Sequence, residues 1–130
     1  SSGPGSDRIY SGNGNDLLIG GSGDDKLKGQ KGTDDLRGGS GNDTLSGGRG
    51  DDIISSGTGK DVIKMSSGND FISDFDLTKD LIKLKNALNN VSLVQTGSDL
   101  RVIELTANSK NILTLKNTLL SDFETQYPIL

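Results

Sequence analysis

One nine-residue unit, repeated eight times without insertion or deletion, fills residues 2–73 of this 130-residue chain. The repeats at 38–46 (GGSGNDTLS) and 47–55 (GGRGDDIIS) show the pattern. Position four is always glycine, position six is always aspartate, and position eight is always leucine or isoleucine. A period of this length is typical of a solenoid, in which each repeat packs mainly against its neighbours.

The three invariant columns supply the candidate site and core residues. At position four stand Gly5, Gly14, Gly23, Gly32, Gly41, Gly50, Gly59 and Gly68. At position six stand Asp7, Asp16, Asp25, Asp34, Asp43, Asp52, Asp61 and Asp70. At position eight stand Ile9, Leu18, Leu27, Leu36, Leu45, Ile54, Ile63 and Ile72. The first two positions are mostly glycine or serine, with Gln30 and Met65 as departures. We expect the aliphatic column to form the core and the glycines to allow turns that other residues disfavour.

Composition excludes several classes of site. The chain contains no cysteine and no histidine, which excludes disulfides, a thiol nucleophile, an imidazole base and the usual zinc ligands. No apolar run is long enough to span a membrane. The net charge of −4 argues against nucleic acid as a partner. No H-E-x-x-H, G-x-S-x-G or nucleotide-binding glycine loop is present, so we expect no enzyme activity in this chain.

The repeat resembles the nonapeptide of the repeats-in-toxin (RTX) family, which binds calcium. The resemblance covers residues 2–73 and implies an all-β fold, a right-handed parallel β-roll in which eight repeats make about four coils. It further implies that positions one to six form a turn and positions seven to nine a short strand. On such a strand position eight points inward, while positions seven and nine point to solvent.

The resemblance also implies where calcium lies. Each ion sits between turns stacked one coil apart and takes one aspartate from each turn, which gives about six interior sites and one or two more at the ends. One side of the roll stacks Asp7, Asp25, Asp43 and Asp61, and the other stacks Asp16, Asp34, Asp52 and Asp70. Glycine carbonyls complete the sites, and the candidates are Gly12, Gly14, Gly20, Gly21, Gly23, Gly29, Gly32, Gly38, Gly39, Gly41, Gly47, Gly48, Gly50, Gly57, Gly59 and Gly68.

Without calcium, the folded state of such a chain is not expected to be stable. A coil of two repeats buries only two aliphatic side chains, which does not offset the conformational entropy of its backbone. Carboxylates stacked at a strand spacing of about 4.8 Å also repel one another. Calcium accepts six to eight oxygen ligands in irregular geometry, whereas magnesium demands tight octahedral geometry. We therefore expect the chain to be disordered without calcium and to fold on binding it.

Residues 74–130 have a different composition, with a single glycine, Gly97. Residues 74–84 resemble the segment that closes RTX arrays. Strands are expected at 91–96 and 100–105 around a turn at 97–99, with a third at 112–115 and a helical turn or docked loop at 119–124. We therefore divide the chain into a β-roll at 1–73 and a small β-rich cap at 74–130 that covers the exposed last coil. The resemblance also implies that residues 74–130 contain the C-terminal secretion signal typical of the family.

Phenylalanines are the candidate plugs between roll and cap, namely Phe71, Phe75 and Phe123. The sequence leaves open whether Asp74, Asp76 or Asp80 completes a terminal half-site.

The resemblance implies a calcium-binding module that supports type I secretion and folds outside the cell, with the secretion apparatus as a partner in transit. We expect a monomeric piece of a longer secreted or cell-surface protein, because the chain begins within the pattern and residues 1–5 lack the features of a signal peptide. Two alternatives remain, an ice-binding or adhesive solenoid and a structural spacer in a surface protein. An ice-binding face requires a flat array of Thr and Asn, and at position three Lys31 and Arg49 interrupt that array on one side.

Overall fold

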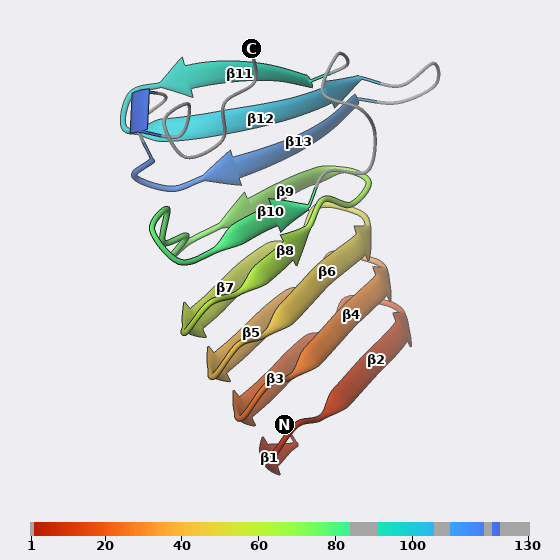
Figure 1. The fold of residues 1–130 in the computed structure, drawn as a ribbon. Helices are drawn as coiled ribbons and strands as arrows, with labels where there is room; N and C mark the ends of the chain where they lie inside the picture. Colours follow the sequence, from red (N-terminus) through yellow and green to blue (C-terminus); the bar gives the residue numbers. More distant parts are fainter. Residues whose placement is uncertain (1, 84–90, 106–109, 119–120, 123–130) are drawn as a thin grey trace.

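The computed structural model describes residues 2–83, 91–105, 110–118 and 121–122. It is built from short strands that wind into a solenoid and end in an antiparallel hairpin (Figure 1). The strands are β1 (Gly3–Pro4), β2 (Arg8–Asn13), β3 (Leu17–Ser22), β4 (Lys26–Lys31), β5 (Asp35–Ser40), β6 (Thr44–Arg49), β7 (Ile53–Thr58), β8 (Val62–Lys64), β9 (Asn69–Ile72), β10 (Leu81–Lys83), β11 (Val91–Thr96), β12 (Asp99–Leu105) and β13 (Lys110–Leu115).

Successive roll strands alternate between two sheets, and each pairs in parallel with the strand two further along the chain. The eight-stranded sheet has the order β1-β3-β5-β7-β9-β13-β12-β11, and the five-stranded sheet has the order β10-β8-β6-β4-β2. Leu36 pairs with Leu18 on one side and Ile54 on the other, so residues 18 apart are in register. The parallel β-roll of about four coils predicted from the sequence is confirmed.

The strands are longer than the sequence analysis predicts. Positions one to three, expected to belong to the turn, continue the strand that positions seven to nine of the preceding repeat begin. In β5, for example, residues 35–37 end one repeat and residues 38–40 begin the next. Only positions four to six therefore form the turn. The expectation failed because it assigned the glycines at positions one and two to the turn, although both positions lie within strands and position two forms ladder pairs, such as Gly21 with Gly39.

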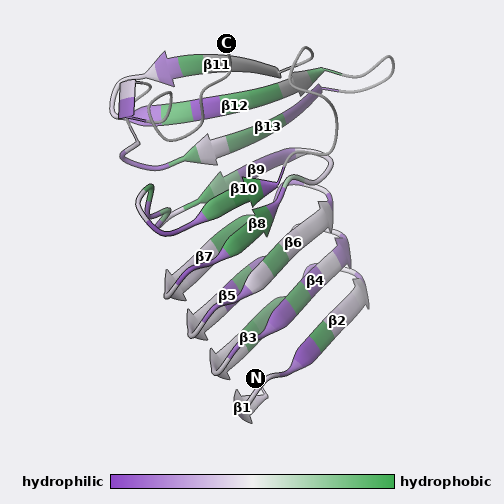
Figure 2. Ribbon diagram, in the orientation of Figure 1, coloured by the Kyte–Doolittle hydropathy of each residue, from purple (hydrophilic) through white to green (hydrophobic). Residues whose placement is uncertain are grey.

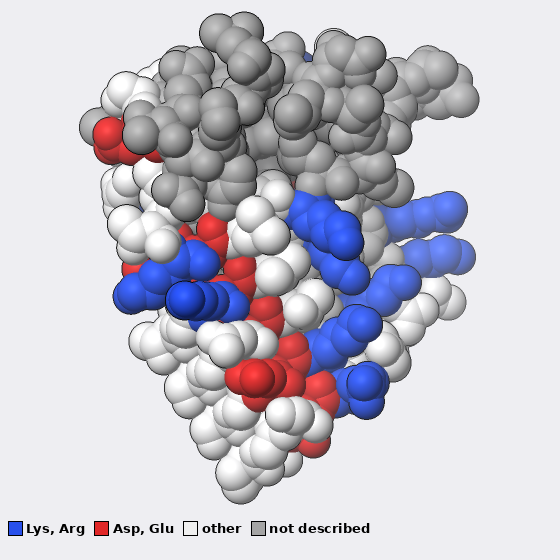
Figure 3. All heavy atoms as spheres, viewed as in Figure 1, with Lys and Arg blue, Asp and Glu red and all other residues white. Residues whose placement is uncertain are grey.

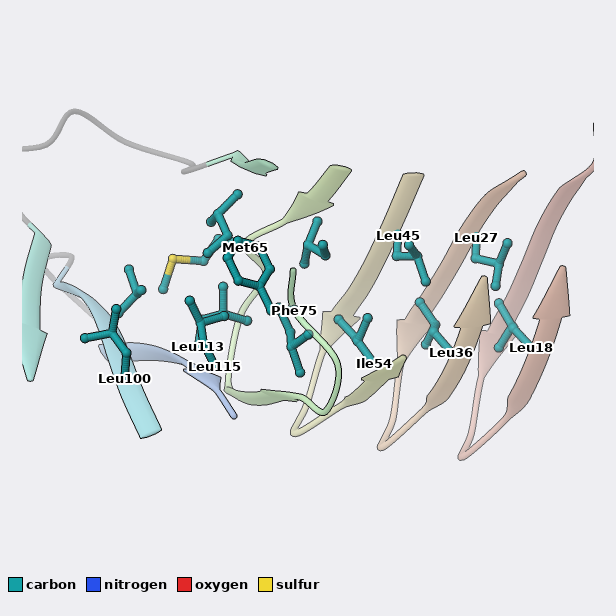
Figure 4. Close-up of a cluster of buried hydrophobic side chains, with 14 residues drawn as sticks. Leu18, Leu27, Leu36, Leu45, Ile54, Met65, Phe75, Leu100, Leu113 and Leu115 are labelled. Carbon is teal, nitrogen blue, oxygen red and sulfur yellow. The ribbon is translucent and has the colours of Figure 1, made fainter. Parts of the chain in front are cut away.

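The core is a double column of aliphatic side chains between the sheets. Leu18, Leu36 and Ile54 project from one sheet toward Leu27 and Leu45 from the other (Figure 4). These five are at most 2% exposed, whereas Leu17 and Ile53 at position seven are about half exposed. Hydrophobic residues are accordingly confined to short segments of each roll strand (Figure 2). Burial of position eight, as predicted, is confirmed.

Both sheets continue beyond Ser73. Strand β10 extends the five-stranded sheet, pairing Ile82 with Ile63, and β13 extends the other sheet, pairing Leu115 with Ile72. The predicted hairpin is present, because β11 and β12 pair antiparallel around Gly97, and β12 pairs antiparallel with β13. The exposed backbone edge of β9 is therefore covered by β13.

Apolar side chains close the end of the core beneath this hairpin. Met65 and Phe75 pack there with Leu100, Leu113 and Leu115 (Figure 4). Phe71, a second predicted plug, is only partly buried, and the Lys116 ammonium lies 5.9 Å from its ring centroid. Phe123, and most of the segment expected at 119–124, fall outside the described residues.

Candidate metal sites

The aspartates of position six form two ladders, one along each row of turns. In each, a carboxylate Oδ1 accepts the backbone N–H of the aspartate one coil earlier. The first ladder joins Asp7 to Asp25, Asp25 to Asp43 and Asp43 to Asp61, each at 2.8 Å. The second joins Asp16 to Asp34 and Asp34 to Asp52 at 2.8 Å, and Asp52 to Asp70 at 3.1 Å. The two stacks predicted from the sequence are thus brought together by the fold.

The second oxygen of these carboxylates has no partner within the described part of the chain. The Oδ2 atoms concerned are buried and belong to Asp7, Asp16, Asp25, Asp34, Asp43, Asp52 and Asp61. An ionised carboxylate oxygen buried without a hydrogen bond or a cation is strongly unfavourable. Seven such atoms in periodic array indicate that these positions are built for a cation.

Burial also changes the acidity of these groups. It raises the pKa of Asp43 to about 6, and the carboxylates of Asp61 and Asp25 raise it further. The pKa values of Asp52 and Asp61 are raised for the same first reason, burial. A bound divalent cation would favour the ionised forms and screen this mutual repulsion.

Backbone carbonyls point into the same spaces. A Cβ added to Gly20 would lie 2.5 Å from the carbonyl oxygen of Gly38, one coil later, and would also collide with Oδ2 of Asp25. An added Cβ at Gly29 would meet Oδ2 of Asp34 and lie 2.6 Å from the Gly47 carbonyl oxygen. Glycine at position one therefore keeps open a space bounded by a carboxylate oxygen and a carbonyl oxygen.

Positions two and four add carbonyls directed along the stack. A Cβ at Gly39 would collide with the carbonyl oxygen of Gly21, and a Cβ at Gly41 with that of Gly23, each one coil earlier. Carboxylate and carbonyl oxygens are the ligands that calcium prefers, in sets of six to eight. No group of three or more acidic side chains converges among the described residues, so carbonyls would supply the larger share of each ligand set. The residues present fit calcium.

The ladder does not end where the eight exact repeats end. Oδ1 of Asp80 accepts the N–H of Asp61 at 3.1 Å, and its Oδ2 accepts the N–H of Asp76 at 2.8 Å. Asp80 is 4% exposed, and burial raises its pKa. Its separation from Asp61 is 19 residues instead of 18, so the exact period did not identify it among the three aspartates that the sequence left open.

The other two of those aspartates have different roles. Asp74 accepts the N–H groups of Ser56 and Gly57 at 2.9 and 3.0 Å, and so provides acceptors for two backbone donors of β7. Asp76 lies at the surface, where the hydroxyl of Thr78 and the ammonium of Lys79 lower its pKa to about 2.

The second ladder ends differently. The hydroxyl of Ser66 donates to Oδ2 of Asp70 at 2.6 Å, so this carboxylate oxygen, unlike the seven others, has a protein partner. Position one of this repeat is Met65, a buried side chain, where the central repeats have glycine. Burial raises the pKa of Asp70 to about 7. The space beside Asp70 is therefore filled by protein atoms.

An outer ladder, formed by position five, was not predicted from the sequence. Oδ1 of Asp24 accepts the N–H of Asn42, and Oδ1 of Asp51 accepts the N–H of Asn69, both at 2.8 Å and one coil later. The signal was available, because position five is Asn or Asp in repeats two, three, five, six and eight. Asp35, at position seven, lies outside this ladder and pairs with Arg37 at 2.7 Å.

A parallel β-roll with stacked carboxylates and carbonyls directed along its turns defines a class of metal-binding repeat solenoids. Residues 1–36, 28–63 and 37–72 match the RTX calcium-binding nonapeptide repeat (4 copies). These segments cover more than half of the chain, which therefore belongs to the RTX family, and its roll is a calcium-binding module. No curated protein matches the chain.

Two solved structures share the fold. The AlgE6R3 subunit of the mannuronan C5-epimerase from Azotobacter vinelandii is 27% identical, with a TM-score of 0.61, over 80% of this chain and 71% of that one. The AlgE6R2 subunit of the same enzyme is 22% identical, with a TM-score of 0.56, over 92% of this chain and 89% of that one. The second likeness concerns the fold alone.

Proposed function

We propose that calcium is the ligand that allows this roll to fold, and that the chain is disordered until calcium binds. The supporting observation is the set of seven buried carboxylate oxygens without partners. Each would oppose folding of the metal-free chain, and each becomes favourable once a cation lies beside it. The double column of aliphatic side chains is narrow and does not compensate for them.

The sites themselves lie between successive aspartates of a ladder. Six spaces of this kind occur, three on each side, and a seventh lies between Asp61 and Asp80. The side chains that would hold the ions are Asp7, Asp16, Asp25, Asp34, Asp43, Asp52, Asp61, Asp70 and Asp80. Carbonyls of positions one, two and four of the flanking turns would complete each ligand set. Position one is serine instead of glycine in the first two repeats. There the hydroxyls of Ser2 and Ser11 donate to the carbonyl oxygens of Gly20 and Gly29.

Calcium-dependent folding suits a protein exported unfolded. Intracellular calcium is scarce, so the chain would stay extended while passing through a type I secretion apparatus and fold outside, where affinities of about 10⁻⁴ to 10⁻³ M suffice. Folding outside would also oppose return of the chain. Membership of the RTX family supports this extracellular role. The structural similarity to a subunit of an epimerase supports the role of a module within a larger protein. The described residues include no helix long and apolar enough to cross a membrane.

Circular dichroism and hydrodynamic radius, measured while calcium is added to metal-free protein, test the proposal. We expect an expanded chain with little β-structure to become compact and β-rich, with magnesium failing to substitute. A compact, β-rich chain in the presence of excess chelator would contradict it. Isothermal titration supplies the independent count of ions, and a value far below seven would overturn the assignment of sites while leaving the folding proposal intact.

A further inference from the structure

The outer face of the five-stranded sheet is strongly cationic although the chain has a net charge of −4. Strands β2, β4, β6, β8 and β10, all described, contain no acidic residue. They carry Arg8, Lys26, Lys28, Lys31, Arg49, Lys64 and Lys83, which together we call the basic face. In Figure 3, Lys and Arg form a band along these strands, beside a column of acidic side chains.

The basic face is ordered by the register of the roll. Arg8 pairs with Lys26, Lys31 with Arg49, and Lys64 with Lys83 on adjacent strands, so three pairs of cations lie at the strand spacing of about 4.8 Å. Six of the seven side chains are exposed and Lys64 is half-buried. None of the seven forms a salt bridge with a carboxylate in the described part of the chain, so their charges are available to a ligand.

A groove of about 470 Å³ lies within the basic face. Its lining includes Tyr10, Lys26, Lys28, Gln30, Ser46 and Lys64, which come from four adjacent strands. The lysines supply positive charge, Gln30 and Ser46 supply neutral hydrogen-bonding groups, and Tyr10 supplies an aromatic ring that is 52% exposed. A groove lined by charges of one sign concentrates ligands of the opposite sign.

We propose that the basic face binds a linear anionic polysaccharide, specifically a chain of uronic acid sugars, lying across the strands along the solenoid axis. The strand spacing is close to the rise of one sugar in an extended chain, so carboxylates of successive sugars meet cations of successive coils. Hydroxyl and amide groups suit the hydroxyls of a sugar, and the ring of Tyr10 can pack against the apolar face of one. This inference goes beyond calcium-dependent folding and requires only the folded roll.

Two comparisons favour this ligand. The roll strands of the opposite sheet, β1, β3, β5, β7 and β9, are not cationic on their outer face, because the charged side chains there, Arg37 and Asp35, neutralise each other. Single-stranded nucleic acid is the other linear polyanion, but its binding sites stack successive bases on several aromatic rings. On the described strands of the basic face, Tyr10 is the single aromatic side chain.

The test is binding of short, end-labelled oligogalacturonate to the calcium-loaded chain, followed by fluorescence anisotropy. We expect saturable binding that weakens as salt increases and is lost when the sugar carboxylates are methyl-esterified. The variant Lys28→Ser/Lys64→Ser should bind about fivefold more weakly, the size expected from two exposed charge pairs. The control Lys60→Ser/Lys110→Ser, which removes the same charge from an exposed turn and from β13, should bind like the parent.

Circular dichroism with calcium, recorded for each protein, separates a failure to bind from a failure to fold. Equal binding by the two double variants, or undiminished binding of the methyl ester, would overturn the proposal. Tighter binding of single-stranded DNA of equal charge would assign the basic face to nucleic acid instead and would also overturn it. Shifts of amide NMR signals confined to β2, β4, β6 and β8 on adding oligogalacturonate would place the ligand as proposed.

Discussion

Oδ1 of Asp43 accepts the backbone N–H of Asp25 at 2.8 Å, while Oδ2 of the same carboxylate is buried without a partner. The two carboxylate oxygens of Asp43 therefore have different roles. The first holds one coil to the next without metal, and the second requires a cation. This division allows the structural and metal-binding parts of each aspartate to be separated by substitution.

Asp43→Asn keeps an oxygen able to accept the N–H of Asp25 and removes the negative charge. Asp43 adjoins the spaces on both sides of it, toward Asp25 and toward Asp61, so two sites should weaken together. We expect the calcium concentration at the folding midpoint to rise about tenfold, equivalent to about 1.4 kcal/mol. Circular dichroism titration measures the midpoint, and isothermal titration measures the ions lost.

Asp70→Asn is the matched control at the end of the second ladder. Asp70 adjoins a single space, toward Asp52, and its Oδ2 already accepts the hydroxyl of Ser66. Its effect should be clearly smaller than that of Asp43→Asn. Equal losses in the two variants would contradict sites placed between stacked aspartates.

The acidity of the buried aspartates predicts how stability depends on pH. In the metal-free fold the pKa of Asp43 is raised to about 6 and that of Asp70 to about 7, above about 3.9 in an unfolded chain. The fold therefore binds more protons than the unfolded chain between about pH 4 and pH 7. Metal-free protein should gain β-structure as the pH falls from 8 to 5, and circular dichroism after removal of metal on a chelating resin measures this.

Calcium must displace those same protons. The metal-free protein that is folded at pH 6 carries these protons, so isothermal titration in buffers of different ionisation enthalpy should reveal proton release on calcium binding at pH 6 and none at pH 8. A calcium affinity that does not change between these two pH values would show that the raised pKa values do not belong to calcium ligands.

The sequence predicts the roll well because its period is exact. Eight invariant aspartates and eight aliphatic residues determine which residues stack, and burial of Leu36 and Ile54 follows from their column alone. The length of the strands was harder to predict. Glycine at position one, as in Gly38, is typical of a turn, but it lies in a strand. Glycine is required there because a Cβ would fill the space beside Asp43.

Two features of the far end depend on packing that no period encodes. Asp80 rejoins the ladder after a one-residue insertion, which shifts it out of the column. Ser66 donates to Asp70 in the repeat whose position one is the buried Met65 instead of glycine. Pairing of β13 with β9 joins residues more than 40 apart in the chain, and only the tertiary structure reveals it.

Gln30→Gly should stabilise the folded roll. Gln30 stands at position two, where the central repeats have glycine, and its backbone has φ = 84°, in the left-handed region that residues with a Cβ disfavour. Removing that strain is expected to raise the free energy of unfolding by about 0.5–1 kcal/mol, after allowing for the greater flexibility of glycine in the unfolded chain. Urea unfolding of calcium-saturated protein measures the difference.

Lys31→Gly is the control for this substitution, because Lys31 is the next residue along β4 and its φ is not positive. There glycine brings only its entropic cost, so Lys31→Gly should lower the free energy of unfolding. A loss of stability in Gln30→Gly would show that the side chain at position 30 contributes more than its backbone strain costs.

Asp80→Asn tests whether the shifted aspartate takes part in calcium binding or only closes the ladder. Asn at position 80 can still accept the N–H of Asp61 through its oxygen, but it loses the charge that faces the space above Asp61. We expect one ion fewer by isothermal titration and little change in the amount of β-structure at saturating calcium. Asp74→Asn is the control outside both aspartate ladders. Asp74 accepts the N–H groups of Ser56 and Gly57 on β7, so this change should lower stability without changing the ion count. If Asp80→Asn leaves the count unchanged, the seventh site does not exist, and the calcium array ends with the exact repeats.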